Sequence, residues 1–146
     1  MNATPAYFAA TAFWVALAHK SDQHHARASA WSRYLIQQDA FILTTEAVLW
    51  EWMNALASAG TRCTTAEGYR RCHQDPSIEV VPFSPDTIAA AVSFYEGRGD
   101  KDWSLTDGLS FLVMEQRRIP RALTTDRHFQ QAGFEAVLLG DPPVAA

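Results

Sequence analysis

The sequence predicts an α/β fold, specifically an α/β/α sandwich around a central parallel sheet of four to five strands. Short apolar stretches near residues 7, 41, 78, 121 and 136 alternate with longer segments in which apolar residues recur at helical spacing. Strands that alternate with helices in this way form parallel sheets covered by helices on both faces. Because no linker or internal repeat interrupts the pattern, we expect a single domain over residues 1–140 and a loose tail over residues 141–146.

Composition supports a globular protein. The 146 residues are 48% hydrophobic and 12% aromatic, enough to build a sizeable core. No apolar run reaches the roughly 18 residues of a membrane-spanning helix, and the N-terminus lacks the basic segment of a secretion signal. Two cysteines are too few for a disulfide framework, and no second Cys/His pair gives a zinc spacing. We therefore expect a cytoplasmic protein with no membrane association.

The first part of the chain is predicted to contain two strands and three helices. In chain order they are a strand, two helices, a strand and a helix, over residues 7–10, 13–19, 23–38, 41–44 and 46–59. Thr45 can cap the last of these helices and Gly60 can end it. Glu46 lies in its first turn, where the helix dipole favours a carboxylate. Glu51 has no such structural explanation, because it lies at the edge of the apolar stripe. Asn54, one turn further on, can orient it.

Three further strands and four helices are predicted after residue 60. The strands cover residues 78–81, 122–124 and 136–139, and the helices cover residues 64–73, 85–95, 105–118 and 127–131. Thr64 and Glu67 have the spacing of a capping box, and Ser84 followed by Pro85 marks the start of the next helix. Ser104 can cap the helix that follows it.

We expect a functional site to form around Asp107 and Asp126. Asp107 lies one turn before Phe111, on a helix face that should be buried. A buried carboxylate must be paired, hydrogen-bonded or bound to a metal, because leaving it charged and alone costs several kcal/mol. Asp126 follows the carboxyl end of a predicted strand, where ligands bind in open α/β sheets. Each acid also has a purely structural interpretation: Asp107 completes a capping box with Ser104, and Asp126 caps the short helix after it.

The chemistry that the sequence favours is based on carboxylates. No GxGxxG, GxxxxGK[ST] or GxSxG motif is present. The sequence therefore does not support a dinucleotide-binding protein, a P-loop NTPase or an α/β-hydrolase. Glu51, Asp107 and Asp126, with Asp100 and Asp102 nearby, favour Mg²⁺ or Mn²⁺, which bind hard oxygen ligands. Such an ion can activate a water and stabilise displacement at phosphorus. The net charge of −4 argues against a protein that coats nucleic acid, but not against an enzyme that binds it through a metal and a few arginines.

Four segments carry a family resemblance: FAATAFW (8–14), TTEAVLWE (44–51), DKDWSLTD (100–107) and LTTDRHF (123–129). Over about residues 7 to 139 the chain resembles a PIN-domain ribonuclease, specifically a VapC-type toxin of a type II toxin–antitoxin system. The resemblance implies a PIN-like α/β/α sandwich, Mg²⁺-dependent cleavage of RNA, a cognate antitoxin as partner, and homodimers. It also implies that Glu51, Asp107 and Asp126 are the catalytic metal ligands and that Asp100 is an accessory acid.

One position departs from the family pattern. The first strand of such proteins normally ends in an aspartate, followed by a threonine and a small polar residue, whereas this chain has Ala10, Thr11 and Ala12. The missing acid is the one that most directly holds the metal in such enzymes. The leading hypothesis is therefore a Mg²⁺-dependent endoribonuclease toxin that is inactivated or weakened at Ala10, by a natural or an engineered change, with Thr11 and Asn54 as accessory residues. The alternative is a non-catalytic PIN-like module that binds antitoxin or RNA. A carboxylate-dependent phosphatase of another α/β class is a third and weaker reading.

Further residues are expected to contact partners. Arg98 and Arg127 lie beside the acidic loops, and we expect them to contact RNA phosphates. The helices near Trp31 and Trp52 carry more aromatic surface than one small domain easily hides, so we expect self-association into a homodimer. An antitoxin peptide is expected to lie in a hydrophobic groove.

Overall fold

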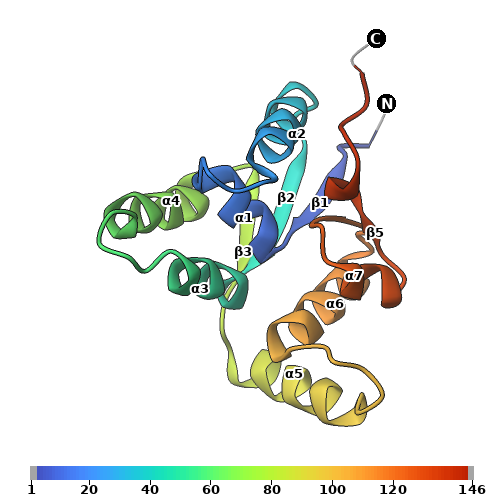
Figure 1. Cartoon of the computed structure of the whole chain (residues 1–146). Coiled ribbons are helices and arrows are strands. Elements are labelled where there is room, and N and C mark those ends of the chain that lie inside the picture. The colour runs from blue at the N-terminus through green and yellow to red at the C-terminus, as the bar shows by residue number, and fades with distance from the viewer. Residues whose placement is uncertain (1–2, 145–146) are drawn as a thin grey trace.

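The computed structural model describes residues 3–144. These residues fold into a five-stranded parallel sheet with helices on both faces (Figure 1). Every strand pair is parallel, and the strand order is β3-β2-β1-β4-β5. The strands are β1 (Ala6–Ala9), β2 (Phe41–Thr45), β3 (Ile78–Val81), β4 (Arg121–Leu123) and β5 (Glu135–Ala136). The predicted α/β/α sandwich is confirmed.

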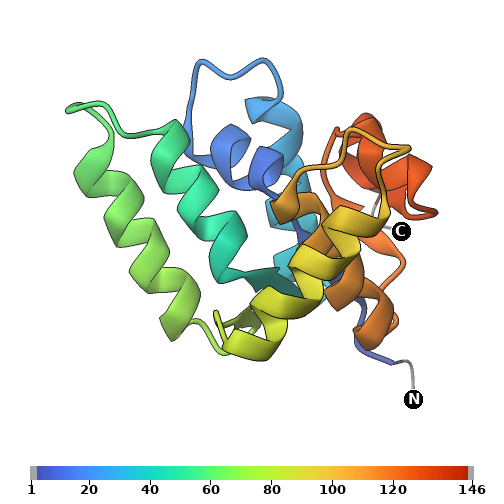
Figure 2. The same ribbon diagram turned by 90° about the horizontal axis from the view of Figure 1, so that it is seen from below.

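The helices form two layers, one on each face of the sheet (Figure 2). Parallel strands are joined by right-handed crossovers, so the direction in which the chain moves across the sheet decides which face its helices cover. The chain moves from β1 to β2 to β3 towards one edge, and α1–α4 therefore lie on one face. It then returns across the sheet from β3 to β4, and α5 and α6 therefore lie on the other face. The helices are α1 (Thr11–Ala18), α2 (His25–Gln37), α3 (Glu46–Ala55), α4 (Arg62–Gln74), α5 (Pro85–Gly97), α6 (Leu105–Arg117), α7 (Arg127–Gln131) and the 3-10 helix η1 (Val137–Leu139). Within the described residues, none is long and apolar enough to cross a membrane.

The central strand β1 determines where a site can form. Phe8 lies opposite Leu43 in β2 on one side and opposite Ala122 in β4 on the other. The direction of winding reverses between β1 and β4, and in doubly wound sheets a crevice opens at the carboxyl ends of the strands at that point. Ala10 directly follows β1 and residues 124–126 directly follow β4, so both segments enter this crevice.

The core is packed tightly on both faces of the sheet. Leu43 and Leu123 are completely buried in it. Between α1 and α3, Trp14 stacks on Trp52 with ring centroids 5.8 Å apart. A β-carbon at Gly68 would lie 2.6 Å from the Trp52 ring, so only glycine lets α4 approach α3 this closely.

The end of α3 differs from the prediction. The helix expected over residues 46–59 ends at Ala55. The hydroxyl of Thr61 donates to the carbonyl of Leu56 at 2.7 Å, so the chain turns away before it reaches Gly60. A side chain beyond the turn therefore takes the role that the sequence assigned to the glycine.

The predicted final strand over residues 136–139 is wrong in its length. Only Glu135–Ala136 pair with β4, and η1 follows at once. Val137 and Leu138 are both buried, whereas consecutive side chains of a strand point to opposite faces. The 3-10 turn allows both side chains to enter the core. The starts of α1, α2 and α4 each lie two residues from the predicted positions, and the expected cap at Thr64 is not used.

The expected aromatic surface on the helices near Trp31 and Trp52 is present only in part. Trp31 and Trp52 are themselves buried, at 5% and 4% exposed, whereas Trp50 on the same helix as Trp52 is 54% exposed. The large apolar side chains that do face solvent lie mainly on α3, α5 and the loop before α5: Trp50, Phe83, Ile88, Val92 and Tyr95. Among the described residues, the exposed apolar side chains therefore gather on the α3–α5 side, while Ile36 on α2 is exposed on its own helix.

The beginning of the predicted loose tail is attached to α2. Trp31 Nε1 donates to the carbonyl of Gly140 at 2.9 Å, and Arg27 Nε donates to Asp141 Oδ1 at 3.0 Å. Residues 145–146, at the end of that tail, lie outside the described residues.

Candidate active site

The crevice at the carboxyl ends of β1 and β4 contains a cavity of about 430 Å³. Side chains from α1, the α1–α2 loop (Asp22, Gln23 and His24), α3, α6, the β4–α7 connection and α7 line it. They include the predicted site residues Ala10, Thr11, Glu51, Asp107 and Asp126. Residues far apart in the sequence therefore line one cavity, which we call the acidic cleft.

Asp107 reaches the acidic cleft from the first turn of α6. Its backbone N–H donates to Ser104 Oγ at 3.0 Å, and its own Oδ2 accepts the Ser104 backbone N–H at 3.1 Å. The structural interpretation, a capping box, is thus correct. It uses only one carboxylate oxygen, however. Within residues 3–144 no partner is found for Asp107 Oδ1, which leaves that oxygen free for a ligand.

Asp126 follows the same pattern at the start of α7. Its Oδ1 caps the helix by accepting the His128 backbone N–H at 2.8 Å, and its own N–H donates to Thr124 Oγ1 at 3.1 Å. No hydrogen bond to Oδ2 is found among the described residues. Both acids are therefore held in place by helix caps that leave one oxygen of each unused.

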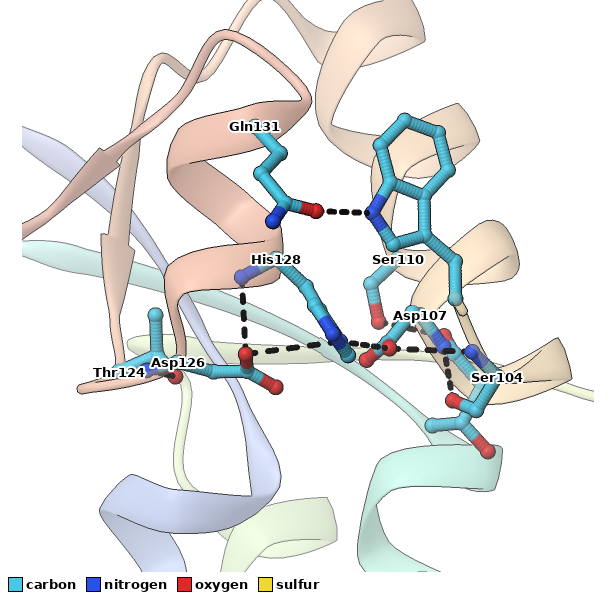
Figure 3. A network of polar contacts seen from close by, with 9 residues as sticks. Ser104, Asp107, Ser110, Thr124, Asp126, His128 and Gln131 are labelled. Atoms are coloured by element: carbon cyan, nitrogen blue, oxygen red, sulfur yellow. Dashed lines mark hydrogen bonds and ion pairs between the residues drawn. The ribbon is translucent and has the colours of Figure 1, made fainter. Parts of the chain in front are cut away.

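His128 connects the two acids and was not predicted as a site residue. Its Nδ1 lies 3.1 Å from Asp107 Oδ2 and 3.5 Å from Asp126 Oδ1, and Figure 3 shows the ring between the two carboxylates. One ligand atom from each of these three residues lies within 4.8 Å of the others. The available sequence signal was its position two residues after Asp126, in the turn that Asp126 caps.

Two further predicted site residues, Glu51 and Ala10, also line the acidic cleft. Glu51 is exposed on α3 and lines the acidic cleft, although it does not belong to the group of atoms within 4.8 Å. Ala10 is the N-cap residue of α1, with extended backbone and no side-chain cap, since a methyl group accepts no hydrogen bond. The position where the family pattern has an acid thus faces the cleft with an apolar side chain.

The predicted accessory and phosphate-contacting residues do not all lie at the acidic cleft. Arg98 donates two hydrogen bonds to Asp100, at 3.0 and 3.1 Å, and its guanidinium lies 4.6 Å from the centre of the Trp103 ring. The hydrogen bond from Arg98 lowers the pKa of Asp100. Neither residue lines the acidic cleft. Arg127 is exposed next to Asp126, and Asn54 lines a neighbouring cavity that shares Glu51 with the cleft.

Comparisons with known proteins give the family and support the fold. A family model described as the PIN domain matches residues 7–135. The 23S rRNA-specific endonuclease VapC20 of Mycobacterium tuberculosis, recorded for two strains, is 28% identical over 131 residues, which cover 89% of this chain and 96% of that protein. The crystal structure of M. tuberculosis VapC20, described as a sarcin–ricin loop cleaving toxin, superposes with a TM-score of 0.77 at 26% identity. That match covers 90% of this chain and 98% of the other.

Proposed function

Because the chain belongs to the PIN-domain family and is of the VapC type, we propose that it is an endoribonuclease toxin whose Mg²⁺-dependent activity is weakened by Ala10. The observation that carries the proposal is the acidic cleft. Asp107 and Asp126 are fixed by helix caps and each keeps one oxygen free, in a cavity that Glu51 also lines. A structural role alone does not require the two acids to converge.

The donor set fits a hard divalent cation. Free oxygens of Asp107 and Asp126, with Glu51, would hold Mg²⁺ or Mn²⁺, which usually bind through a few carboxylates and retain some waters. A bound ion of this kind supplies an activated water and stabilises negative charge at phosphorus. His128 Nδ1 hydrogen-bonds with Asp107 Oδ2 and lies 3.5 Å from Asp126 Oδ1, so its ring fixes the spacing between the two carboxylates.

Ala10 also favours a second candidate function, a non-catalytic module that binds antitoxin or RNA. A methyl group offers no oxygen, so the cleft has one anionic ligand fewer than the family pattern provides. The two functions differ in one measurable respect. A weakened nuclease regains activity when the acid is restored, whereas a binding module does not.

The deciding experiment compares the chain as it stands, with Ala10, and its Ala10→Asp variant on structured RNA, with Mg²⁺, with Mn²⁺ and with a chelator. If the restored ligand stabilises the transition state by about 4 kcal/mol, cleavage should accelerate by roughly a thousandfold. Ala12→Asp, which also adds a carboxylate beside the cleft but two residues further on, is the matched control and should gain little. Equal and negligible cleavage by all three proteins, with RNA still bound, would establish the binding module instead.

The substrate and partners belong to the same proposal. VapC20 is named for its action on 23S rRNA, so a ribosomal RNA hairpin loop is the first substrate to test. In this proposal Arg98 and Arg127 contact RNA phosphates. A cognate antitoxin inhibits the toxin, which acts in the cytoplasm. Light scattering tests the homodimer, which the exposed stripe Ile88, Val92 and Tyr95 on α5 favours.

A further inference from the structure

We propose that the cavity beside the acidic cleft, between α3 and the α5–α6 pair, binds one unstacked nucleobase of the RNA substrate. The inference rests on the proposed function, because it concerns how a substrate of the acidic cleft is held. It assigns a second task to the same face of the molecule, namely recognition of a base next to the phosphate that is cleaved.

The first observation is that the two cavities are adjacent. The neighbouring cavity has a volume of about 320 Å³, and both it and the acidic cleft are lined by Glu51 and Thr106. An RNA strand with a phosphate at Asp107 and Asp126 would therefore place an adjacent nucleotide at the mouth of the second cavity.

The second observation is the exposure of Trp50. Its side chain is 54% exposed, whereas the other tryptophans, Trp14, Trp31, Trp52 and Trp103, are at most 7% exposed. Phe83 packs against it at 5.6 Å between ring centroids with an interplanar angle of 88°, which holds the indole in place without covering it. Single-stranded RNA is recognised largely by stacking of splayed-out bases on aromatic rings held in this way.

The third observation concerns the rest of the lining. Ala91, Leu105 and Leu109 give the cavity apolar walls, while Asn54 and Thr106 add polar groups at its edge. An asparagine side chain offers both donors and an acceptor, which suits the edge of a base. The combination of an apolar slot with a few convergent polar groups is typical of small-ligand sites.

Size and position favour a base over a protein segment. The cavity is at the lower end of the range of ligand pockets, about 300–1,000 Å³, which suits one planar ring system. A helix docked on this face would need a long groove, whereas this cavity ends where the acidic cleft begins. A second protein chain is therefore one of the outcomes that the experiment must separate.

The experiment measures binding of RNA hairpins that differ only in single abasic positions of the loop, with Ca²⁺ in place of Mg²⁺, so that a cation still joins the phosphate to the carboxylates while cleavage is suppressed. Trp50→Ala should raise the Kd of the intact hairpin by roughly 5- to 150-fold, which is the energy of one stacked base converted at tenfold per 1.4 kcal/mol. One abasic position should weaken binding to the natural protein by a similar factor and have no further effect on Trp50→Ala. Trp50→Phe should restore most of the affinity.

Ile36→Ala is the control, because Ile36 is 73% exposed on α2, lines neither this cavity nor the acidic cleft, and lies outside the α5 stripe. It should keep the natural Kd within about twofold and the same sensitivity to the abasic position.

The contradicting outcomes are distinct. If Trp50→Ala keeps the natural Kd while the natural protein binds RNA and Ala10→Asp cleaves it, the nucleobase site is wrong and the proposed function stands. If Trp50→Ala and the abasic position weaken binding additively, Trp50 does not contact that base. If the variant dissociates a dimer at unchanged Kd per protomer, a second copy occupies the cavity. If the natural protein has no RNA affinity and Ala10→Asp no cleavage, both proposals fall.

Discussion

Two sites in this molecule place a carboxylate at the start of a helix against a histidine, and they are built for different purposes. One is the acidic cleft, with Asp107 and Asp126 around His128. The other joins α3 to α4: Glu46 in the first turn of α3 meets Tyr69 and His73 of α4, and we call it the α3–α4 clasp.

In the α3–α4 clasp both carboxylate oxygens are used. His73 Nε2 lies 2.6 Å from Glu46 Oε1, and the Tyr69 hydroxyl lies 3.1 and 3.0 Å from the two oxygens. Glu46 is only 9% exposed. Burial, together with the hydrogen bond to Glu46, raises the pKa of Tyr69. The clasp is satisfied by its own side chains and needs no ligand.

The acidic cleft has the opposite arrangement, since Asp107 and Asp126 both line a cavity and each keeps one oxygen without a hydrogen bond among the described residues. The difference shows that partial burial of an acid beside a histidine is not in itself a sign of function. What distinguishes the two sites is whether acceptor capacity remains after the local structure has been satisfied. Substitutions should therefore separate them into a site that governs activity and a site that governs stability.

The largest expected effect is on catalysis at the cleft. In the Ala10→Asp background, Asp126→Asn should lower Mg²⁺-dependent RNA cleavage by about a thousandfold, because a neutral amide replaces a metal-binding carboxylate. Asparagine caps helices as well as aspartate does, so the melting temperature should hardly change. Cleavage rates and thermal unfolding curves of the same preparations test the expected loss of activity and the unchanged stability. A variant that retains activity would remove Asp126 from the proposed ligands.

The next effect is on stability at the clasp. Glu46→Ala should destabilise the fold by about 1–3 kcal/mol, because Tyr69 and His73 lose their acceptor. In a chain of this size that corresponds to a fall in melting temperature of roughly 2–10 °C. Glu46→Gln keeps an acceptor and should lose less. In the Ala10→Asp background neither change should alter RNA cleavage at low temperature by more than a small factor, and a large loss would contradict the separation of the two sites.

Metal should stabilise the protein only through the cleft. At a Mg²⁺ concentration tenfold above its Kd, the Ala10→Asp protein should gain about 1.4 kcal/mol of stability. Asp126→Asn should abolish the gain, and Glu46→Gln should leave it unchanged. Melting temperatures with Mg²⁺ and with a chelator give the comparison. Equal stabilisation of all three variants would mean that the ion binds elsewhere.

The smallest effect concerns the cysteine next to the clasp. Burial, assisted by Asp75, raises the pKa of the Cys72 thiol to about 11, whereas Cys63 is exposed on the same helix. Because the thiolate is the reactive form, a thiol reagent at neutral pH should label Cys63 and spare Cys72. Glu46→Ala should speed the labelling of Cys72 by up to about tenfold, through local opening of α4. Asp126→Asn should leave the labelling rate of Cys72 unchanged. Mass spectrometry of the labelled peptides measures both rates.

Local signals in the sequence predicted much of this structure. The caps at Thr45, Ser84 and Ser104 are all present, and Asp126 caps α7 as expected. These features depend on residues within one turn of each other, which the sequence contains in full. The parallel sheet was also predictable, because each strand is a short apolar run with a helix between it and the next.

Features that depend on contacts between distant segments were not predictable. The contact of His128 with Asp107 requires α7 and α6 to meet. The distribution of tryptophans shows the same limit in a different way. Trp52 is buried, as the apolar spacing of Val48, Leu49, Trp52 and Leu56 predicts, but the sequence contains no signal that Trp50, two residues earlier, is 54% exposed beside a cavity. The bidentate pair of Arg98 with Asp100, two residues apart, depends on how one loop closes.

The place of β1 in the middle of the sheet has a consequence for biosynthesis. The first strand to leave the ribosome pairs with β2 soon afterwards, but its other edge stays open until β4 emerges. At roughly 5–20 residues per second, this delay lasts several seconds, during which a buried apolar strand presents unpaired backbone groups to other nascent chains. The same delay separates Glu51 from Asp107 and Asp126, so the acidic cleft cannot assemble until nearly the whole chain has been translated.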